Sequence, residues 1–198
     1  MKNKSIYLLF IGFIIISNIT FVTAVKRNTK TNNSFLNEND IVQMINQINK
    51  SIIYRYHEGL MEFGARYTGS ENCTLAGNYI YNCFEKCGLE VDYHDWDFGG
   101  YDSKNIVATI PGNNPDSNSI FIMSAHYDCS EGSMGANDDG SGVAGMLAIA
   151  EIMSNYSFNH TIKFIAFSGE EVGTYGSFTY ARDAYNNADN IVAIINVD

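Results

Sequence analysis

Apolar residues recur at two different spacings along this chain. Between residues 41 and 52, isoleucine and methionine recur every three or four positions, which predicts an amphipathic helix that begins near residues 39–40. A second helix is predicted from about Glu71 to Cys87, with Ser70 as its N-cap and Gly88 at its end. The first part of the folded region is therefore expected to be helical.

Beyond this region, short apolar runs alternate with helical stretches. The predicted strands cover residues 89–97, 105–110, 120–125, 162–168 and 191–197, and the predicted helices cover 141–155 and 175–185. This alternation favours an α/β fold with a central mixed, mostly parallel sheet and helices on both faces. The last four strands are apolar enough to be buried on both faces, so we expect them in one sheet. In such sheets, ligands bind at the carboxyl ends of the strands.

The N-terminus has the pattern of a secretory signal peptide. Two lysines precede an apolar run over residues 6–16, and Val22-Thr23-Ala24 is typical of a signal-peptidase site, so we expect residues 1–24 to be cleaved and the protein to be secreted. An uncleaved membrane anchor is the less favoured alternative, because a bilayer span needs about 20 apolar residues. Residues 25–40 are polar and are predicted to be a flexible linker or pro-segment. Residues 41–198 then form the folded domain.

Composition and charge narrow the function classes. Hydrophobic residues make up 45% of the chain and only two prolines occur, which is ordinary for a globular protein. The formal net charge is -10, and removal of the first 24 residues, with two lysines and no acid, brings it to -12. Binding to nucleic acid needs clustered lysine and arginine, which this chain lacks. We therefore expect no nucleic-acid partner, and no stable membrane insertion after signal cleavage.

Four cysteines would face an oxidising compartment if the chain is secreted. Two of them, Cys83 and Cys87, are neighbours on one predicted helix, so a disulfide from Cys73 to either is favoured over a bond between them. The connectivity stays open, because the fourth cysteine, Cys129, is also available. The chain has no CxxC motif, which argues against a structural zinc site with sulfur ligands.

Two predicted strands end in residues that suit metal chemistry. His126 and Asp128 lie two apart at the end of strand 120–125, so both side chains point the same way. A neutral imidazole is a good zinc ligand, and a carboxylate bound to its other ring nitrogen fixes the tautomer. Glu170 and Glu171 follow strand 162–168, where one acid can bind metal and its neighbour can act as general base on the reacting water. Each pair alone is weak evidence for a metal site.

Further acids are expected at the same edge of the sheet. Asp138 and Asp139 precede a predicted helix, where such residues are more often helix caps than metal ligands, and Asp198 follows the last strand. Gathered together, these carboxylates would repel one another without cations. Oxygen ligands combined with imidazole suit zinc, with cobalt or manganese as chemical alternatives. The combination therefore predicts a metal site.

Five motifs of this chain, taken together, resemble the motifs of one known family. They are residues 66–70 (RYTGS), 126–128 (HYD), 137–142 (NDDGSG), 169–171 (GEE) and 196–198 (NVD). The chain resembles the secreted co-catalytic di-zinc aminopeptidases of the bacterial leucyl aminopeptidase type, which are related to the glutamate carboxypeptidase-like zinc metallopeptidases. The resemblance implies a metalloaminopeptidase that hydrolyses the N-terminal peptide bond of peptides or proteins.

The resemblance also implies roles for individual residues. His126 and Asp198 would bind one zinc, Asp138 would bridge two zinc ions, and Glu171 would bind the second zinc. Glu170 would be the general base, and Asp128 would orient His126. In that family the peptide bond corresponding to Asp138–Asp139 is often cis.

One ligand of the family has no counterpart here. It is a histidine well downstream of the third acidic segment, and His57, His94 and His160 match no family motif. The resemblance therefore implies a complete ligand set for one zinc, an incomplete set for the other, and negligible activity of these 198 residues by themselves.

Two other functions fit the same fold. A glutaminyl cyclase would use a single zinc, and it normally shows another pattern where NDDGSG stands. A receptor-like or adhesion ectodomain would have lost some of the predicted ligands, all of which are present. A zinc assay separates the second alternative from an enzyme.

Overall fold

The computed structural model describes residues 36–198. The predicted signal peptide and most of the predicted linker lie outside these residues. Within them, no helix has both the length and the apolar character that a membrane span requires.

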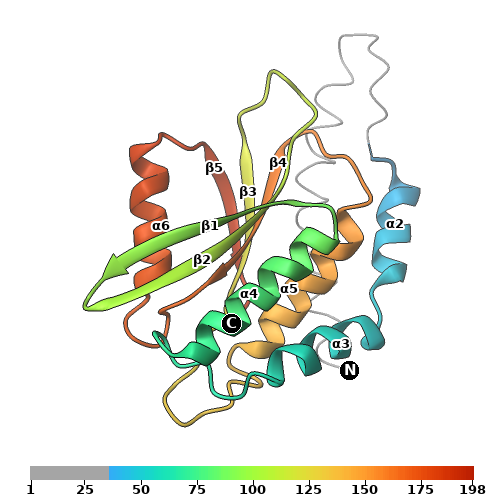
Figure 1. Ribbon diagram of the computed structural model, residues 1–198. Helices are drawn as coiled ribbons and strands as arrows, with labels where there is room; N and C mark the ends of the chain where they lie inside the picture. The colour runs from blue at the N-terminus through green and yellow to red at the C-terminus, as the bar shows by residue number, and fades with distance from the viewer. Residues whose placement is uncertain (1–35) are drawn as a thin grey trace.

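A five-stranded mixed sheet forms the centre of the fold (Figure 1). Its strands are β1 (Glu90–Phe98), β2 (Tyr101–Ile110), β3 (Ile120–His126), β4 (Thr161–Phe167) and β5 (Ile191–Asn196), in the order β1-β2-β4-β3-β5. The β1–β2 and β2–β4 pairs are antiparallel, whereas β3 pairs in parallel with both β4 and β5. Of the five strands, only β2 therefore runs opposite to the rest. The prediction of one mixed sheet containing the last four apolar strands is confirmed.

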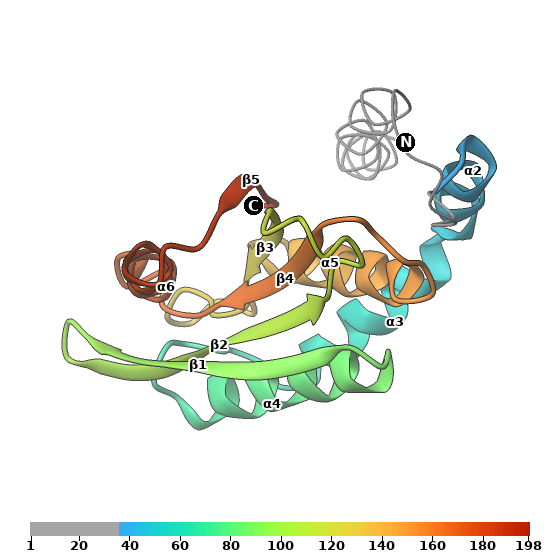
Figure 2. The ribbon, with the colours of Figure 1, turned by 90° about the horizontal axis from the view of Figure 1, so that it is seen from above.

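Helices cover both faces of this sheet, as predicted. Figure 2 shows α4 (Glu71–Lys86) and α5 (Gly140–Met153) on one side and α6 (Tyr175–Asn186) on the other. α5 is apolar around its whole circumference and is almost completely buried, because it lies between the sheet and the N-terminal helices. Strands β3 and β4 are largely buried on both faces, which explains why apolar residues predominate in their sequences.

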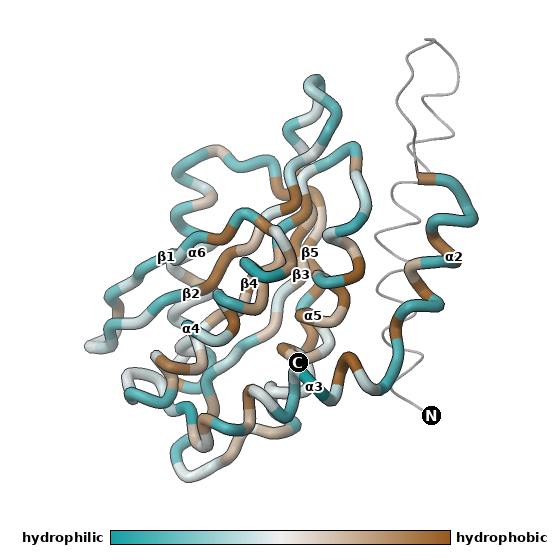
Figure 3. Tube along the Cα trace, turned by 45° about the vertical axis from the view of Figure 1, so that its right-hand side comes forward, coloured by the Kyte–Doolittle hydropathy of each residue, from teal (hydrophilic) through white to brown (hydrophobic). Residues whose placement is uncertain are grey.

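Between residues 36 and 61, the structure contains two helices where the sequence predicted one. They are α2 (Glu38–Gln47) and α3 (Lys50–Met61). α2 is amphipathic, and its hydropathy alternates along the tube in Figure 3. The break occurs because Ile48 is extended and the side chain of Asn49 accepts a hydrogen bond from the backbone N–H of Ile52 at 3.2 Å, which caps α3. Asn37 caps α2 in the same way, so this helix begins inside the predicted linker.

The predicted disulfide is wrong for the described residues. All four cysteines, Cys73, Cys83, Cys87 and Cys129, are free thiols. Cys73 and Cys83 are both on α4, and ten residues of helix separate their Cα atoms by about 15 Å. A disulfide needs Cα atoms within about 7 Å, so the rigid helix prevents this pairing.

Capping of α4 agrees with the prediction. The hydroxyl of Ser70 accepts a hydrogen bond from the backbone N–H of Cys73 at 3.1 Å, and Gly88 beyond the helix has a φ of 77°. We expect Ser70→Ala to lower the free energy of unfolding by about 1 kcal/mol, because an N–H of the first turn loses its partner. Urea unfolding of the two proteins measures this difference. Ser70→Asp retains an acceptor and serves as the control; an equal loss in that variant would show that capping is not the cause.

Candidate metal centre

Three predicted ligands converge at the carboxyl edge of the sheet. His126 is the last residue of β3, Asp198 follows β5, and Asp138 lies in the loop before α5. One ligand atom from each of the three residues lies within 4.8 Å of the other two. Nε2 of His126 is 2.9 Å from Oδ1 of Asp138 and 4.0 Å from Oδ1 of Asp198. Because β3 and β5 are parallel neighbours, their carboxyl ends bring His126 and Asp198 together.

The end of β5 is held in register by β3. The hydroxyl of Ser124 donates to Oδ1 of Asn196 at 2.8 Å, and the backbone N–H of Val197 donates to the carbonyl of Ser124 at 2.9 Å. These bonds extend the pairing of the two strands up to the residue before Asp198. The position of Asp198 is therefore set by the backbone of its neighbour strand.

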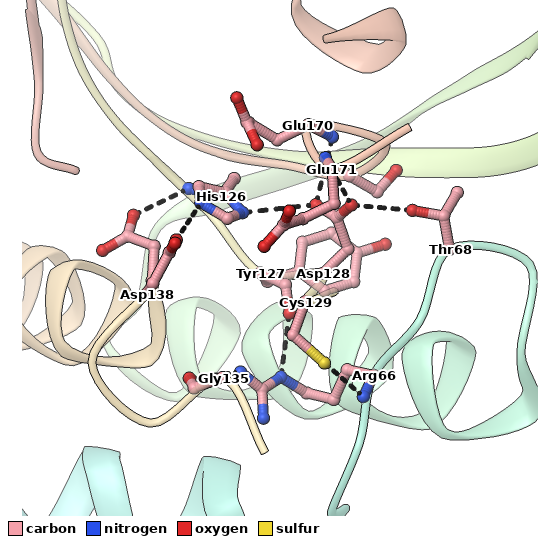
Figure 4. A network of polar contacts seen from close by, with 12 residues as sticks. Arg66, Thr68, His126, Tyr127, Asp128, Cys129, Gly135, Asp138, Glu170 and Glu171 are labelled. Carbon is pink, nitrogen blue, oxygen red and sulfur yellow. Dashed lines mark hydrogen bonds and ion pairs between the residues drawn. The ribbon is translucent and has the colours of Figure 1, made fainter. Parts of the chain in front are cut away.

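The two adjacent aspartates divide the two roles that the sequence allowed. Asp139 is the N-cap of α5: one carboxylate oxygen accepts from the N–H of Gly142 at 2.9 Å and the other from the N–H of His126 at 3.0 Å. Burial raises the pKa of Asp139 to about 7. Asp138 instead extends a mostly exposed carboxylate toward His126 (Figure 4). The peptide bond between them is cis, as the family resemblance implied.

Asp128 lies on the other side of the His126 ring from Asp138 (Figure 4). Its Oδ1 is 3.4 Å from Nδ1 of His126, which is close, although the two groups are not aligned as a hydrogen bond. The buried Asp128 carboxylate also accepts the hydroxyl of Thr68 at 2.7 Å. Burial alone would raise the pKa of Asp128, but His126 and Thr68 outweigh burial and lower the pKa.

Asp128 also anchors the loop that carries the two glutamates. The backbone N–H groups of Glu170 and Glu171 each lie 3.2 Å from one of its carboxylate oxygens and donate to it. From the sequence, we expected a contact of Asp128 with His126 alone. The structure shows one buried carboxylate between the imidazole and the glutamate loop, so these two parts of the site cannot shift independently.

His126 is surrounded by negative charge. Burial lowers the pKa of its imidazole, but the carboxylates of Asp128, Asp139 and Glu170 outweigh burial and raise the pKa to about 9. The site thus stabilises a positive charge at the position of the ring. A divalent cation satisfies the same requirement when the neutral imidazole is its ligand.

The two glutamates point in different directions, as predicted. Glu170 lines a cavity of about 500 Å³ together with His126 and Asp198. Burial raises the pKa of Glu170. The carboxylate of Glu171 accepts from the backbone N–H of Ser130 at 3.0 Å and from its hydroxyl at 2.6 Å. Glu171 is not part of the three-residue ligand cluster found among residues 36–198.

Several residues shape the site through contacts that the sequence pattern does not indicate. The buried guanidinium of Arg66 donates to the carbonyls of Tyr127, Met134 and Gly135 at 2.8 to 2.9 Å, which holds the loop between His126 and Asp138. Arg66 and Thr68 both belong to the RYTGS motif, but nothing in the sequence indicates partners 60 or more residues away. Ser130 carried no signal at all.

The donor set fits zinc. One imidazole nitrogen and two carboxylates converge, and three protein ligands with an open position are typical of catalytic zinc. Glu170 lies beside this cluster without belonging to it, as a general base would. The arrangement can hold a cation and activate water next to it.

Substitution of Thr68 tests whether the hydrogen bond to Asp128 contributes to metal binding by His126. We expect Thr68→Val to weaken zinc binding by about 10- to 100-fold, because the buried Asp128 carboxylate loses a hydrogen bond and holds His126 less firmly. Titration against a chromophoric chelator measures the affinity. Thr68→Ser retains the hydroxyl and is the control. If Thr68→Val binds zinc as tightly as the parent, Thr68 does not contribute to zinc binding.

Comparisons with known proteins identify related sequences. Residues 105–198 match the model of peptidase family M28. A protein of Pyrenophora tritici-repentis described as a probable zinc metalloprotease is 30% identical over 190 residues, covering 81% of this chain and 44% of the relative. Aminopeptidase YwaD of Bacillus subtilis is 39% identical over 83 residues, covering 42% of this chain and 18% of the relative. The chain thus spans less than half the length of these relatives.

Solved structures share the fold at lower identity. A leucine aminopeptidase precursor from Bacteroides thetaiotaomicron has a TM-score of 0.65 and 23% identity, covering 76% of this chain and 62% of that protein. A glutaminyl cyclase from Porphyromonas gingivalis has a TM-score of 0.69 and 22% identity, covering 77% of this chain and 59% of that protein. The fold is therefore common to both activities and does not by itself distinguish them.

Proposed function

We propose that the complete protein is a zinc-dependent aminopeptidase, because residues 105–198 match the model of peptidase family M28 and the chain is similar to a probable zinc metalloprotease and to an aminopeptidase. The observation that carries the proposal is the convergence of His126, Asp138 and Asp198 beside Glu170. A bound zinc ion polarises the substrate carbonyl and lowers the pKa of water to roughly 7. The residues of this chain supply the remaining functions.

Glu170 is the general base in this proposal. It lines the cavity together with His126 and Asp198, and burial raises the pKa of its carboxyl above the ordinary value. It takes the proton from the attacking water and then delivers it to the leaving amine. Asp128 lies against the His126 ring of the ligand cluster, and the same carboxylate keeps the Glu170 backbone in place.

We further propose that the complete enzyme holds two zinc ions. Asp138 presents an exposed carboxylate that can bridge two cations, and Glu171 is oriented by Ser130 on the same edge of the sheet. The other three histidines contact different partners: His57 the carbonyl of Ala136, His94 the carboxylate of Asp183, and His160 the hydroxyl of Ser117. A further ligand for the second zinc is therefore expected from another part of the complete protein.

The substrate is proposed to be the free N-terminus of a peptide or protein. The test is hydrolysis by the complete zinc-loaded protein of three peptides: one with a free leucine N-terminus, the same peptide acetylated, and one with N-terminal glutamine. We expect the protein to release leucine from the peptide with the free N-terminus but not from the acetylated peptide. A chelator should abolish this activity. Cyclisation of the glutamine peptide without hydrolysis would instead support a glutaminyl cyclase, and zinc binding without any turnover would support a receptor-like protein.

Secretion is a separate proposal. It is supported by the signal-peptide pattern of residues 1–24, which lie outside the described residues. N-terminal sequencing of the protein recovered outside the producing cell should begin at Val25. An intact Met1 on membrane-bound protein would contradict cleavage.

A further inference from the structure

One side chain of another strand binds both the start of the loop bearing Glu170 and Glu171 and the first turn of the helix that follows it. Residues 168–174 connect β4 to α6, and Asn105 lies on β2, next to β4. Oδ1 of Asn105 accepts from the N–H of Ser168 at 3.1 Å, and its Nδ2 donates to the carbonyl of Gly176 at 2.8 Å. We infer that Asn105 is a positioning residue for Glu170, an inference that rests on the proposed function.

A second contact fixes which way the Asn105 amide points. Its Nδ2 also donates to Nδ1 of His94 at 3.0 Å, so this nitrogen of His94 is the acceptor and the ring proton is on Nε2. Nε2 in turn donates to Oδ2 of Asp183 at 3.1 Å. Both amide protons of Asn105 are therefore used, and its oxygen is directed at Ser168. The chain Asp183–His94–Asn105 connects α6, β1 and β2 to the start of the glutamate loop.

Close packing leaves the loop little room to relax without Asn105. The indole of Trp96 donates to the hydroxyl of Ser168 at 3.1 Å, and a Cβ added to Gly169, whose φ is 72°, would fall 2.6 Å from Cη2 of Trp96. A Cβ added to Gly176 would meet the carbonyl oxygen of Ser168 and Oδ1 of Asn105. The first turn of α6 thus approaches the loop start closely, with the completely buried Asn105 between them.

Asn105 and Asp128 hold complementary parts of the loop. Asp128 binds the N–H groups of Glu170 and Glu171 within the loop, whereas Asn105 binds Ser168 at its start and Gly176 in the first turn of α6. Asn105 is not among the residues that line the cavity of the metal centre or form the ligand cluster. Loss of Asn105 is therefore expected to displace Glu170 without removing a ligand or a substrate contact.

Kinetics of the complete, zinc-loaded protein test the inference. Asn105→Ala should lower kcat by about 10- to 100-fold, because a displacement near 1 Å can cost about 10²-fold. KM and zinc content should stay within about twofold of the parent, since binding groups are untouched. Tyr56→Phe is the matched control: it removes a partly buried hydrogen bond to Glu151 on the α3 side of the molecule and should leave kcat unchanged. A parental kcat in Asn105→Ala, or an equal kcat loss in Tyr56→Phe, would overturn the inference.

Hydrogen exchange gives a readout that does not depend on activity. In Asn105→Ala, the amide of Ser168 should exchange at least about tenfold faster, while amides of the buried helix α5 keep their parental rates. If the parent lacks aminopeptidase activity, the proposed function fails, yet this measurement still decides whether Asn105 holds the loop. Uniformly faster exchange throughout the chain would show a general structural role and contradict positioning.

An isosteric variant covers the case in which Asn105→Ala does not fold. Asn105→Asp retains the acceptor for Ser168 but loses both donors, so the bond to Gly176 is lost. We expect kcat to fall about tenfold with Ser168 still protected and zinc content unchanged. A parental kcat in this variant would contradict the inference.

Discussion

Glu170→Gln should lower kcat of the complete enzyme by about 10²- to 10⁴-fold while its zinc content stays at that of the parent. The reason is that an amide cannot accept the proton of the attacking water, although it fills the same volume. Glu170 shares the cavity with His126 and Asp198, but it is outside the three-residue ligand cluster within residues 36–198. The effect is therefore expected in catalysis and not in metal affinity.

The measurement pairs steady-state kinetics with metal analysis of the same sample. Glu58→Gln is the matched control, because it makes the same substitution at an exposed position on α3, away from the cavity. This control should retain parental kcat and zinc content. Loss of zinc together with activity in Glu170→Gln would identify Glu170 as a ligand and leave the general base unassigned.

His126→Ala should weaken zinc binding to this 198-residue chain by about 10² to 10³-fold. Structural zinc sites with four ligands bind with roughly 10–16 kcal/mol, so each ligand contributes about 2.5–4 kcal/mol. Removal of the imidazole leaves only Asp138 and Asp198 in the cluster. We expect the parent chain to bind about one zinc ion and His126→Ala to bind none at micromolar concentration.

Isothermal titration with zinc measures both the stoichiometry and the affinity. His160→Gln is the control, since His160 immediately precedes β4 at the opposite edge of the sheet from the end of β3. Circular dichroism of each variant verifies that it is folded. Parental zinc affinity in His126→Ala would refute the proposed centre, and two tightly bound zinc ions in the parent would show that residues 36–198 contain a ligand we have not assigned.

The spacing of apolar residues along the chain was sufficient to predict most of the secondary structure. The strands of the sheet core, β3 and β4, are largely buried, and apolar residues therefore predominate in both, with Ser124 and Lys163 as interior exceptions. The single error in the helices came from Asn49, because the periodicity of the isoleucines continues through the break at Ile48. A polar side chain that caps a new helix is decided by local hydrogen bonding, which hydropathy does not record.

The amino-acid sequence by itself determined which residues of this protein can do chemistry. His126, Asp198 and Glu170 end strands or follow them directly, and the alternation of strands and helices was enough to predict that such positions meet at one edge. Only the tertiary structure decided how they are held. Asp128 binds the backbone of the glutamate loop and Asn105 binds Ser168 at its start, and these contacts join residues 40 or more positions apart. A pattern of spacing reports neighbours along one element, whereas such contacts depend on strand order and register, which emerge only when the whole core is packed.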